Sequence, residues 1–376
     1  MIKYLGSKRL LVGAILRAVR ALPDVRTVVD LFSGTARVGH ALKRGGYRVL
    51  ANDHNAYAAT LARCYVQADR EDVQAEAARL IRELNALPGR PGFFTETYCV
   101  RSRFFHPRNG ARIDAIREAI AAKGLNSELE AVLLVALMEA ADRVDSTTGV
   151  QMAYLKQWAP RALRPLELRM PDVLPRGPHG RCEAHECDAL VAAARLAGDV
   201  VYLDPPYNQH SYLGNYHVWE TLVRWDRPEV YGVACKRTDC RTRRSAFNSR
   251  ARCLDALRAV VAAAQARTLL VSFSDEGYVS RAAMEALLAT RGAVLTLAHD
   301  HKRYVGAQIG IYNPRGEKVG RVSHLRNTEF LYVVTDADTV TRLADVLPSA
   351  ERRPTTAAAG CGASAESGGW GSGGRG

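Results

Sequence analysis

The stretch Asp199-Val200-Val201-Tyr202-Leu203-Asp204-Pro205-Pro206-Tyr207 decides how this chain of 376 residues is built. Residues 199–203 have the β-branched and aromatic composition of a buried strand. The two prolines that follow can continue neither a strand nor a helix, so the strand ends at Asp204. A carboxylate, a fixed carbonyl and an aromatic ring therefore stand at the carboxyl end of a strand, where open α/β sheets bind their ligands.

The chain ahead of this strand has the order of a nucleotide-binding βαβ unit. Residues 27–32 predict one strand, and residues 47–53 predict the next. Between them, residues 33–39 predict a tight turn that opens a helix through Arg44. The turn lacks the Lys-Ser/Thr pair of a phosphate loop and the three glycines of a dinucleotide fold, which favours a ligand smaller than a dinucleotide.

Two positions near this turn are candidate ligand contacts. Gly34 lets the backbone approach a ligand closely, and the N-terminus of the following helix suits a carboxylate such as that of a methionine moiety. Asp53 ends the second strand, about twenty residues after the turn, where ribose hydroxyls are recognised. The alternative is that Asp53 caps a helix before Asn55.

The remaining segments predict a catalytic α/β domain of residues 1–69 and 176–345, interrupted by a helical insertion of residues 70–175 and followed by a disordered tail of residues 346–376. Helices are expected on both faces of the sheet. The further predicted strands are residues 268–273, 293–298 and 330–334, and the predicted helices are residues 9–22, 71–87, 109–123, 127–143, 214–226, 249–266 and 280–291. Residues 307–324 predict a hairpin.

The composition indicates an anionic partner. A formal net charge of +13 favours nucleic acid, although the excess of 44 Arg over 8 Lys is also what a GC-rich coding sequence produces. Eight cysteines without disulfide-scaffold spacing and the absence of a long apolar run predict a cytoplasmic protein with no membrane span. Cys182, His185 and Cys187 are spaced like part of a metal site, but no second pair follows at zinc-site spacing, so no metal is predicted.

The residues at the end of the deciding strand suit methylation of an exocyclic amine on a nucleic-acid base. The lone pair of such an amine is delocalised into the ring, so its nitrogen is a poor nucleophile. Asp204 and the Pro205 carbonyl can accept its hydrogens and free the lone pair, and Tyr207 can stack on a base that has left the helix. The alternative is a strand that ends in a Pro-Pro turn with an incidental Asp and Tyr.

Four motifs, in this order, resemble those of the Dam-like family of adenine-specific DNA methyltransferases. They are Lys3-Tyr4-Leu5-Gly6-Ser7-Lys8, Asp30-Leu31-Phe32-Ser33-Gly34-Thr35, Asn52-Asp53 and Asp204-Pro205-Pro206-Tyr207-Asn208. The resemblance spans roughly residues 1–335. It implies a Rossmann-like methyltransferase sheet, S-adenosyl-L-methionine as the methyl donor and double-stranded DNA as the substrate. It also implies that the insertion carries at least part of target recognition.

The resemblance implies roles for individual residues. The expected catalytic residues are Asp204, Pro205, Pro206 and Tyr207. The residues expected to contact the donor or to line its pocket are Tyr4, Lys8, Asp30, Phe32, Gly34, Asp53, Asp188 and Asp204. Lys8 is expected to pair with a ligand carboxylate, whereas Asp188 either accepts a hydrogen bond from an adenine amine or only caps a helix. Ala36 stands where many relatives have glycine, which the turn tolerates if its φ is negative.

An arginine-rich segment after the catalytic motif predicts contact with DNA phosphates. Its expected DNA-binding residues are Lys236, Arg237, Arg241, Arg243 and Arg244, and Arg250 and Arg252 follow closely. The alternative is a solvated basic helix. A second group of arginines lies in the insertion, at Arg101, Arg103, Arg108, Arg112 and Arg117. The hairpin of residues 307–324 is a third candidate, with an ordinary closing ribbon as its alternative.

The sequence therefore predicts an enzyme that methylates the N6 amine of adenine in a specific double-stranded DNA sequence. Cytosine-N4 methylation follows the same logic, but Asp rather than Ser at position 204 favours adenine. The sequence also leaves open methylation of an RNA or protein amine, and a catalytically silent DNA-binding protein. A cognate restriction endonuclease that acts separately is a partner that this prediction allows.

Overall fold

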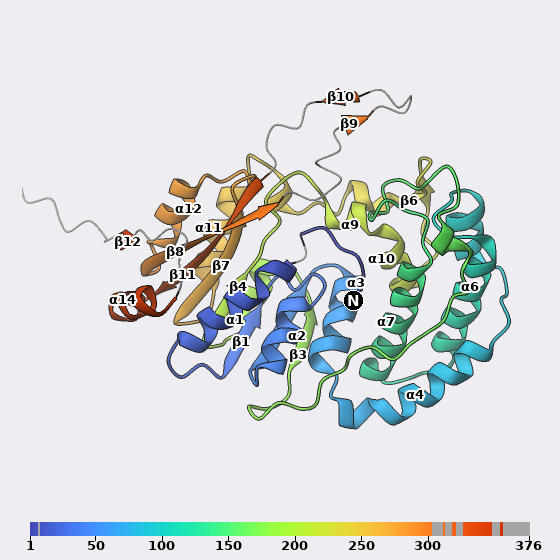
Figure 1. Ribbon diagram of the computed structural model, residues 1–376, viewed down its shortest axis with the longest axis horizontal. Helices are drawn as coiled ribbons and strands as arrows, with labels where there is room; N and C mark the ends of the chain where they lie inside the picture. Colours follow the sequence, from blue (N-terminus) through green and yellow to red (C-terminus); the bar gives the residue numbers. More distant parts are fainter. Residues whose placement is uncertain (7, 303–310, 313–317, 321–325, 348–353, 356–376) are drawn as a thin grey trace, which may run out of the picture.

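The computed structural model describes residues 1–6, 8–302, 311–312, 318–320, 326–347 and 354–355 (Figure 1). Its central sheet is formed by β1 (Thr27–Asp30), β2 (Arg48–Asp53), β3 (Glu183–Glu186), β4 (Val200–Leu203), β7 (Thr268–Ser274), β8 (Ala293–Lys302), β11 (Arg326–Thr335) and β12 (Pro354–Thr355). The strand order is β12-β8-β11-β7-β4-β1-β2-β3. The strands from β3 to β7 are parallel, and β11 lies antiparallel between β7 and β8. The chain thus winds outward in both directions from the β1–β4 pair, a topological switch point.

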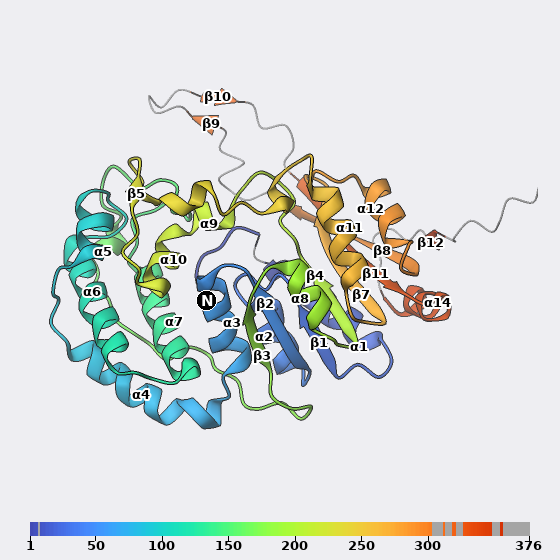
Figure 2. The ribbon, with the colours of Figure 1, turned by 180° about the vertical axis from the view of Figure 1, so that it is seen from behind.

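Alternate residues of each strand pack into two apolar layers, one on each face of the sheet. In β1, Val28 belongs to one layer and Val29 to the other, as the two-residue period of a strand requires. One face is covered by α1 (Val12–Ala21), α2 (Arg37–Arg44) and α14 (Ala337–Val346). The opposite face is covered by α8 (Ala189–Arg195), α11 (Cys253–Ala263) and α12 (Arg281–Leu288), which Figure 2 shows from the other side. The prediction of helices on both faces is confirmed.

A helical module lies beyond the β3 edge of the sheet (Figure 1). It contains α4 (Arg70–Ala86), α5 (Phe93–Thr95), α6 (Pro107–Ala122) and α7 (Ser127–Arg143). These helices pack around α3 (Ala56–Ala62) and α10 (His217–Arg224), which come from the chain on either side of the module. One apolar cluster runs from the sheet into α7 without a break. The module is therefore held to the sheet by a shared core.

Short elements complete the structure. They are α9 (Tyr212–Asn215), the 3-10 turns Lys8–Leu10, Pro160–Leu163, Thr238–Arg241 and Ala246–Asn248, the π turns Arg63–Gln67 and Glu96–Val100, and the two-stranded ribbons β5 (Val230–Tyr231) with β6 (Lys236–Arg237) and β9 (Ile311–Tyr312) with β10 (Lys318–Gly320). No helix in the described part of the chain is long and apolar enough to cross a membrane.

The structure differs from the sequence predictions in several places. The arginine-rich segment begins in β6 and continues through two 3-10 turns, so the alternative of a basic helix is wrong. The helix α3 was not predicted, because all seven of its residues are buried and its sequence has no amphipathic period. The β12 pair of residues joins the sheet at β8, within the predicted disordered tail. The ribbon of β9 and β10 agrees with the predicted hairpin, whose turn lies outside the described residues.

Candidate active site

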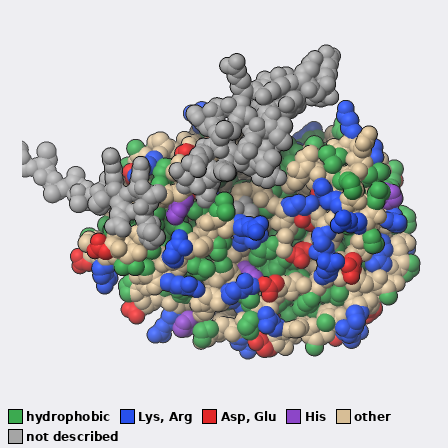
Figure 3. Space-filling view, viewed as in Figure 1, with side chains coloured by type: hydrophobic (Ala, Val, Ile, Leu, Met, Phe, Trp, Pro, Cys, Tyr) green, Lys and Arg blue, Asp and Glu red, His purple; other side chains and the backbone are tan. Residues whose placement is uncertain are grey.

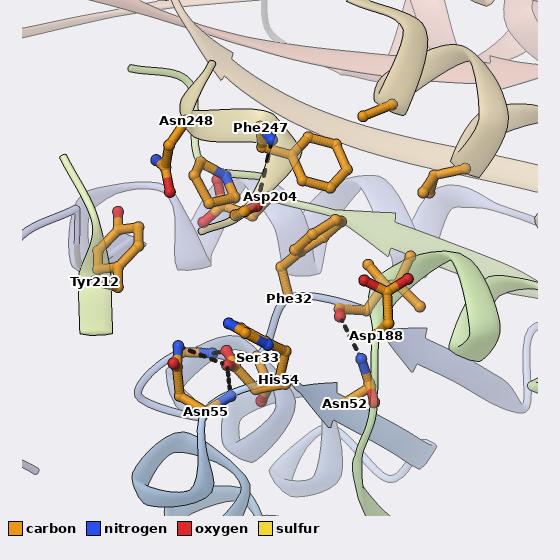
Figure 4. A pocket seen from close by; sticks show the side chains of 18 of the residues that line it. Phe32, Ser33, Asn52, His54, Asn55, Asp188, Asp204, Tyr212, Phe247 and Asn248 are labelled. Atoms are coloured by element: carbon orange, nitrogen blue, oxygen red, sulfur yellow. Dashed lines mark hydrogen bonds between the residues drawn. The ribbon is translucent and has the colours of Figure 1, made fainter. Parts of the chain in front are cut away.

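A cavity of about 660 Å³ opens at the carboxyl ends of β1, β2 and β4. Figure 4 shows the aromatic rings of Phe32 and Phe247 next to each other in it. In this view Asp188 lies on one side of Phe32, and Tyr212 lies on the other. The cavity is therefore long enough to have two ends, one beside β3 and one beside the loop after β4.

Asp204 follows β4 directly and reaches the cavity with a side chain that is 18% exposed. Both of its polar contacts are made by one oxygen. Oδ1 lies 3.0 Å from Lys8 Nζ and accepts a hydrogen bond from Ser272 Oγ at 2.9 Å. Within the described residues, Oδ2 has no hydrogen-bond partner. Burial raises the pKa of Asp204, and the charge of Lys8 opposes this shift. One carboxylate oxygen is thus fixed by the protein while the other remains available.

Lys8 was expected to pair with a ligand carboxylate, but its ammonium faces two carboxylates of the protein. Its Nζ lies 3.0 Å from Asp204 Oδ1 and 3.1 Å from Glu329 Oε2. The centre of the Tyr207 ring is 5.7 Å away. Burial favours the neutral amine, but the attraction of Asp204 and Glu329 outweighs it and holds the pKa of Lys8 well above its usual range. Lys8 is therefore a buried cation shared by two acids.

Asp30 ends β1 underneath the turn of residues 33–39. Its Oδ2 accepts hydrogen bonds from Ser33 Oγ at 3.2 Å and from Gly39 N at 3.1 Å. Its Oδ1 is buried and has no partner within the described part of the chain. Burial raises the pKa of Asp30 to about 7. Because buried polar atoms almost always have partners, the orphan oxygen on the cavity wall suits a positively charged or hydrogen-bonding group of a ligand.

The turn itself is braced by Asp53. The Asp53 carboxylate accepts hydrogen bonds from Gly34 N at 3.0 Å through Oδ2 and from Asn55 N at 2.9 Å through Oδ1. Asp53 thus lines the cavity and holds the backbone of Asn55, which is the N-cap residue of α3. Its role toward a ligand stays a prediction. Gly34 has φ +54°, and a Cβ there would meet the Tyr4 ring at 3.6 Å. The contact is an ordinary van der Waals distance, so it is the positive φ that favours glycine at this position.

Ala36 departs from the expectation of a negative φ. It has φ +59°, in the left-handed region, at the start of α2. A residue with a Cβ pays about 1–2 kcal/mol in this conformation. The expected condition for tolerating alanine here, a negative φ, is therefore not met, and Ala36 adds strain to the turn.

Tyr4 forms one wall of the cavity as the middle ring of three. Its ring stacks on Tyr212 at 5.1 Å and on Tyr216 at 4.5 Å between centroids. Its hydroxyl lies 3.1 Å from the Tyr57 hydroxyl. The stack fixes Tyr4 in place, so it presents a rigid, mostly apolar surface to whatever occupies the cavity.

Phe32 and Asp188 shape the end of the cavity beside β3. The Phe32 ring meets Phe247 edge to face at 5.2 Å. Asp188 accepts a hydrogen bond from Leu190 N at 2.8 Å as the N-cap of α8, and it also lines the cavity. The helix cap is therefore observed, and a contact of Asp188 with an adenine amine stays a prediction. The Asn52 amide joins the ends of β1 and β3 by donating to the carbonyls of Leu31 and Cys187.

The residues after Asp204 lie around the other end. Pro205 is buried, and Pro206 lines the cavity. Tyr207 is not among the lining residues, and its ring packs edge to face on Phe273 at 5.8 Å. The loop that follows is held by Asn248, whose amide donates to the carbonyls of Asn208 and His210. The arginine-rich segment thus fixes the loop after the catalytic motif.

The five expected DNA-binding residues fall into two groups. Arg237 is 4% exposed and pairs with Asp226 and Asp239. Arg243 pairs with the buried carboxylate of Glu220 at 2.9 Å and also contacts Asp239. These two arginines hold the segment against the protein.

The remaining three residues are more accessible. Arg241 is exposed and stacks on the Tyr231 ring at 3.9 Å, and Arg244 is exposed at the cavity rim. Lys236 is half-buried, with its ammonium beside the sulfur of Met152. Figure 3 shows Lys and Arg side chains gathering on one face of the molecule, over α10 and α7.

Sequence reasoning missed three residues of the site. Ser272 lies within the apolar strand β7, and Glu329 lies on β11. Asn55 lines the cavity with a buried Oδ1 that has no partner among the residues that the structure describes. Ser272 and Glu329 had no local signal, because both belong to strands whose sequences read as sheet core. Asn55 could have been suspected from its place two residues after Asp53.

The cysteine pair of the weak metal motif has structural contacts. Cys182 is buried, and its sulfur accepts a hydrogen bond from Val49 N at 3.3 Å. Across the residues that the structure describes, no group of three or more His, Cys, Asp or Glu side chains is arranged to hold a metal ion.

These features define an α/β methyltransferase: a switch-point cavity, acids at the ends of two neighbouring strands, and an Asp-Pro-Pro-Tyr motif in which one carboxylate oxygen has no hydrogen-bond partner in the described residues. The sequence of residues 4–286 matches the family model described as D12 class N6 adenine-specific DNA methyltransferase. The chain belongs to this family, so the predictions of a Rossmann-like methyltransferase fold and of an adenine-specific DNA methyltransferase are confirmed.

Named relatives agree with this assignment. Type II methyltransferase M.NlaIII of Neisseria lactamica is 28% identical over 312 residues, which cover 81% of this chain and 88% of that protein. Type II methyltransferase M.CviAII of Paramecium bursaria Chlorella virus 1 is 27% identical and covers 81% of this chain and 92% of its own length. Type II methyltransferase M.FokI of Planomicrobium okeanokoites is 31% identical over 77% of this chain, which spans 47% of that protein.

Proposed function

We propose that the protein transfers the methyl group of S-adenosyl-L-methionine to the N6 amine of an adenine extruded from double-stranded DNA, with Asp204 as the residue that receives the amine. The observation that carries this assignment is that the two oxygens of the Asp204 carboxylate differ in their contacts. Oδ1 is engaged by Lys8 and Ser272, whereas Oδ2 has no partner in the described residues and the side chain lines the cavity.

In this proposal Asp204 Oδ2 accepts one hydrogen of the amine, and the Pro205 carbonyl accepts the other. Both contacts draw nitrogen toward a tetrahedral geometry and free its lone pair. The nitrogen–methyl bond forms as the sulfur–methyl bond of the donor breaks, and the amine then gives one proton to Asp204 or to water. The raised pKa of Asp204 improves it as the proton acceptor.

The donor fits the end of the cavity beside β3. It supplies an electrophilic methyl group on a sulfonium. The orphan Oδ1 of Asp30 suits the ammonium of its methionine moiety, and Asp53 and Asn55 stand where its ribose hydroxyls would lie. Phe32 offers a ring face and Asp188 an acceptor for its adenine. Gly34 lets the turn approach closely.

The target adenine fits the other end, between Asp204 and the ring stack of Tyr4 and Tyr212. Tyr207 would stack on it after a change of side-chain rotamer, since its ring now packs on Phe273. Arg241 and Arg244 are exposed and suit contact with DNA phosphates. The helical module is proposed to carry target recognition.

Two further parts of the proposal concern context. Several relatives are named type II methyltransferases, which supports a separate restriction endonuclease of the same specificity. A cytoplasmic location is supported by the seven free cysteines of the described residues, as expected in a reducing compartment.

The assignment is tested by Asp204→Ala and Asp188→Ala. With unmethylated phage DNA and tritiated S-adenosyl-L-methionine, Asp204→Ala should reduce the rate of methyl transfer by ~10²-fold or more, as loss of a key transition-state hydrogen bond does. Its affinity for DNA should be unchanged, because phosphate contacts carry most of that affinity. Asp188→Ala should act mainly on donor binding. An Asp204→Ala rate above about a tenth of wild type would contradict the catalytic role.

A further inference from the structure

Glu329 reaches the catalytic carboxylate from a part of the chain that lies outside the matched family region, which ends at residue 286. It stands on β11, the antiparallel strand, where it pairs with Ser274 of β7 and His299 of β8. Its side chain is 14% exposed. A carboxylate on an interior strand, with so little exposure, needs a partner.

That partner is Lys8, which Glu329 shares with Asp204. Glu329 Oε2 lies 3.1 Å from Lys8 Nζ, and Asp204 Oδ1 lies 3.0 Å from the same nitrogen. The Lys8 side chain is 6% exposed, so little water competes with either contact. The three charges come from the N-terminal turn, from the end of β4 and from β11. The sheet topology alone brings them together.

The shared ammonium has a geometric consequence for Asp204. Lys8 is pulled by a carboxylate on each side, so it cannot move to bridge both oxygens of Asp204. Ser272 donates to the same oxygen that Lys8 contacts. Both contacts therefore hold Asp204 by Oδ1 and leave Oδ2 toward the cavity.

We propose that Glu329 is a positioning residue for methyl transfer, which anchors Lys8 so that Asp204 keeps one oxygen for the target amine. The proposal rests on the proposed role of Asp204. Glu329 does not contact the substrate. It sets the orientation of Asp204, and it weakens the attraction of Asp204 to Lys8 by attracting the same ammonium.

The charge of Glu329 changes the pKa of Asp204 in a definite direction. Burial, first, and the charge of Glu329 raise the pKa of Asp204, whereas Lys8 lowers it. Removing the Glu329 charge should therefore lower the pKa of Asp204. Since the ionised form of Asp204 accepts the amine, the acidic limb of the kcat profile should move to lower pH.

Other titratable groups also face Asp204. Tyr202 on β4, Tyr207 after it and Tyr212 on α9 all have pKa values raised by burial and stay neutral at the pH of the assay. Asp30 on β1 has a pKa raised by burial to about 7 and titrates near the assay pH. The proposed effect of Asp30 on donor binding does not enter the pH profile when kcat is measured at a saturating concentration of the donor.

The experiment compares Glu329→Gln and Glu329→Ala with the wild type. Glutamine retains an acceptor for Lys8 and removes the charge, whereas alanine removes both. For Glu329→Gln we expect kcat to fall by about threefold to tenfold and the acidic limb to move down by roughly half a pH unit or more. For Glu329→Ala we expect a fall of about 10²-fold. In both variants KM for phage DNA should stay within about twofold.

Glu285→Gln is the matched control. Glu285 has a similarly covered side chain, 20% exposed, and pairs with a single arginine, Arg281, away from the cavity. It should leave kcat and the acidic limb unchanged. An acidic limb that stays in place in Glu329→Gln would overturn the proposal. Loss of a purely structural ion pair would lower thermal stability without moving the limb.

Glutamine decides the question if the alanine variant does not fold. Failure of the proposed function looks different: wild-type protein would then transfer no methyl group to adenine at all. If the wild type is active and both Glu329 variants have the same kcat as the wild type, only the positioning role is contradicted.

Discussion

Two regions of the protein, the buried Lys8 site and the arginine-rich segment of residues 236–252, hold their positive charges in opposite ways. At the sheet end, Lys8 is almost fully buried and meets two carboxylates at 3.0 and 3.1 Å. In the arginine-rich segment, Arg237 pairs with two carboxylates and is buried, while Arg241 and Arg244 are exposed. Burial, rather than residue type, therefore separates cations that organise the protein from cations that are available to a phosphate.

The largest effect is expected for a change of the buried Lys8. Lys8→Met removes the only cation that contacts Asp204 in the described residues, so the pKa of Asp204 should rise further. Less of it is then ionised at neutral pH, and kcat at pH 7 should fall by ~10²-fold. The activity should partly recover as the pH is raised. The control is Lys3→Met, whose ammonium pairs with Asp145 outside the cavity. Similar losses in both variants would show that stability alone is affected.

A second change tests whether Arg237 is structural. Within the described residues, Arg237→Leu leaves Asp226 without its arginine and leaves Asp239 paired with Arg243 alone. Breaking a fully buried pair costs about 3–5 kcal/mol. Because these carboxylates are 38% and 29% exposed, we expect a lower loss in the free energy of unfolding, about 2–3 kcal/mol. Urea denaturation measures it, with Arg244→Leu as a control that should change stability by less than about 0.5 kcal/mol.

The exposed arginines should show the reverse behaviour. Replacing Arg241 and Arg244 together with Gln should leave stability nearly unchanged and reduce the log–log salt dependence of DNA binding by about two. The methylated sequence should stay the same, because phosphate contacts carry no sequence information. Arg20 and Arg342, exposed on α1 and α14, which contribute no residue to the cavity lining, supply the matched double control. An unchanged slope would exclude phosphate contact, and a new set of methylated sites would show base reading.

The smallest effect concerns pH and Asp30. Its pKa, raised by burial to about 7, means that the unliganded protein holds a proton there below pH 7. Stability from this proton is present at low pH and is lost as the pH rises through about 7. A donor ammonium needs the carboxylate, so affinity for S-adenosyl-L-methionine should rise by up to about tenfold from pH 6 to pH 8. Calorimetry should show this rise in the wild type and a flat, weaker profile in Asp30→Asn. A pH-dependent profile in the variant would assign the titration to another group.

Most of the sheet could be predicted from the sequence because its strands carry their own signals. The run before Asp204 and the turn before α2 have local patterns of apolar residues, glycine and proline that predict β4, β1 and β2. The helix α3 could not be found in the same way, because a helix that is buried on all sides loses its amphipathic period. The same holds for the contribution of Ser272, which sits in a fully buried strand.

The sequence by itself determined the family, the α/β order and most of the predicted residues that line the cavity, since motifs at strand ends converge on one edge of a parallel sheet. Only the tertiary structure decided how the charges are paired. It placed Lys8, a predicted ligand contact, between Asp204 and Glu329, and it buried Arg237 in ion pairs while leaving Arg241 exposed. Pairing depends on which strands lie next to each other and on how much water reaches each charge, and neither quantity is local in the sequence.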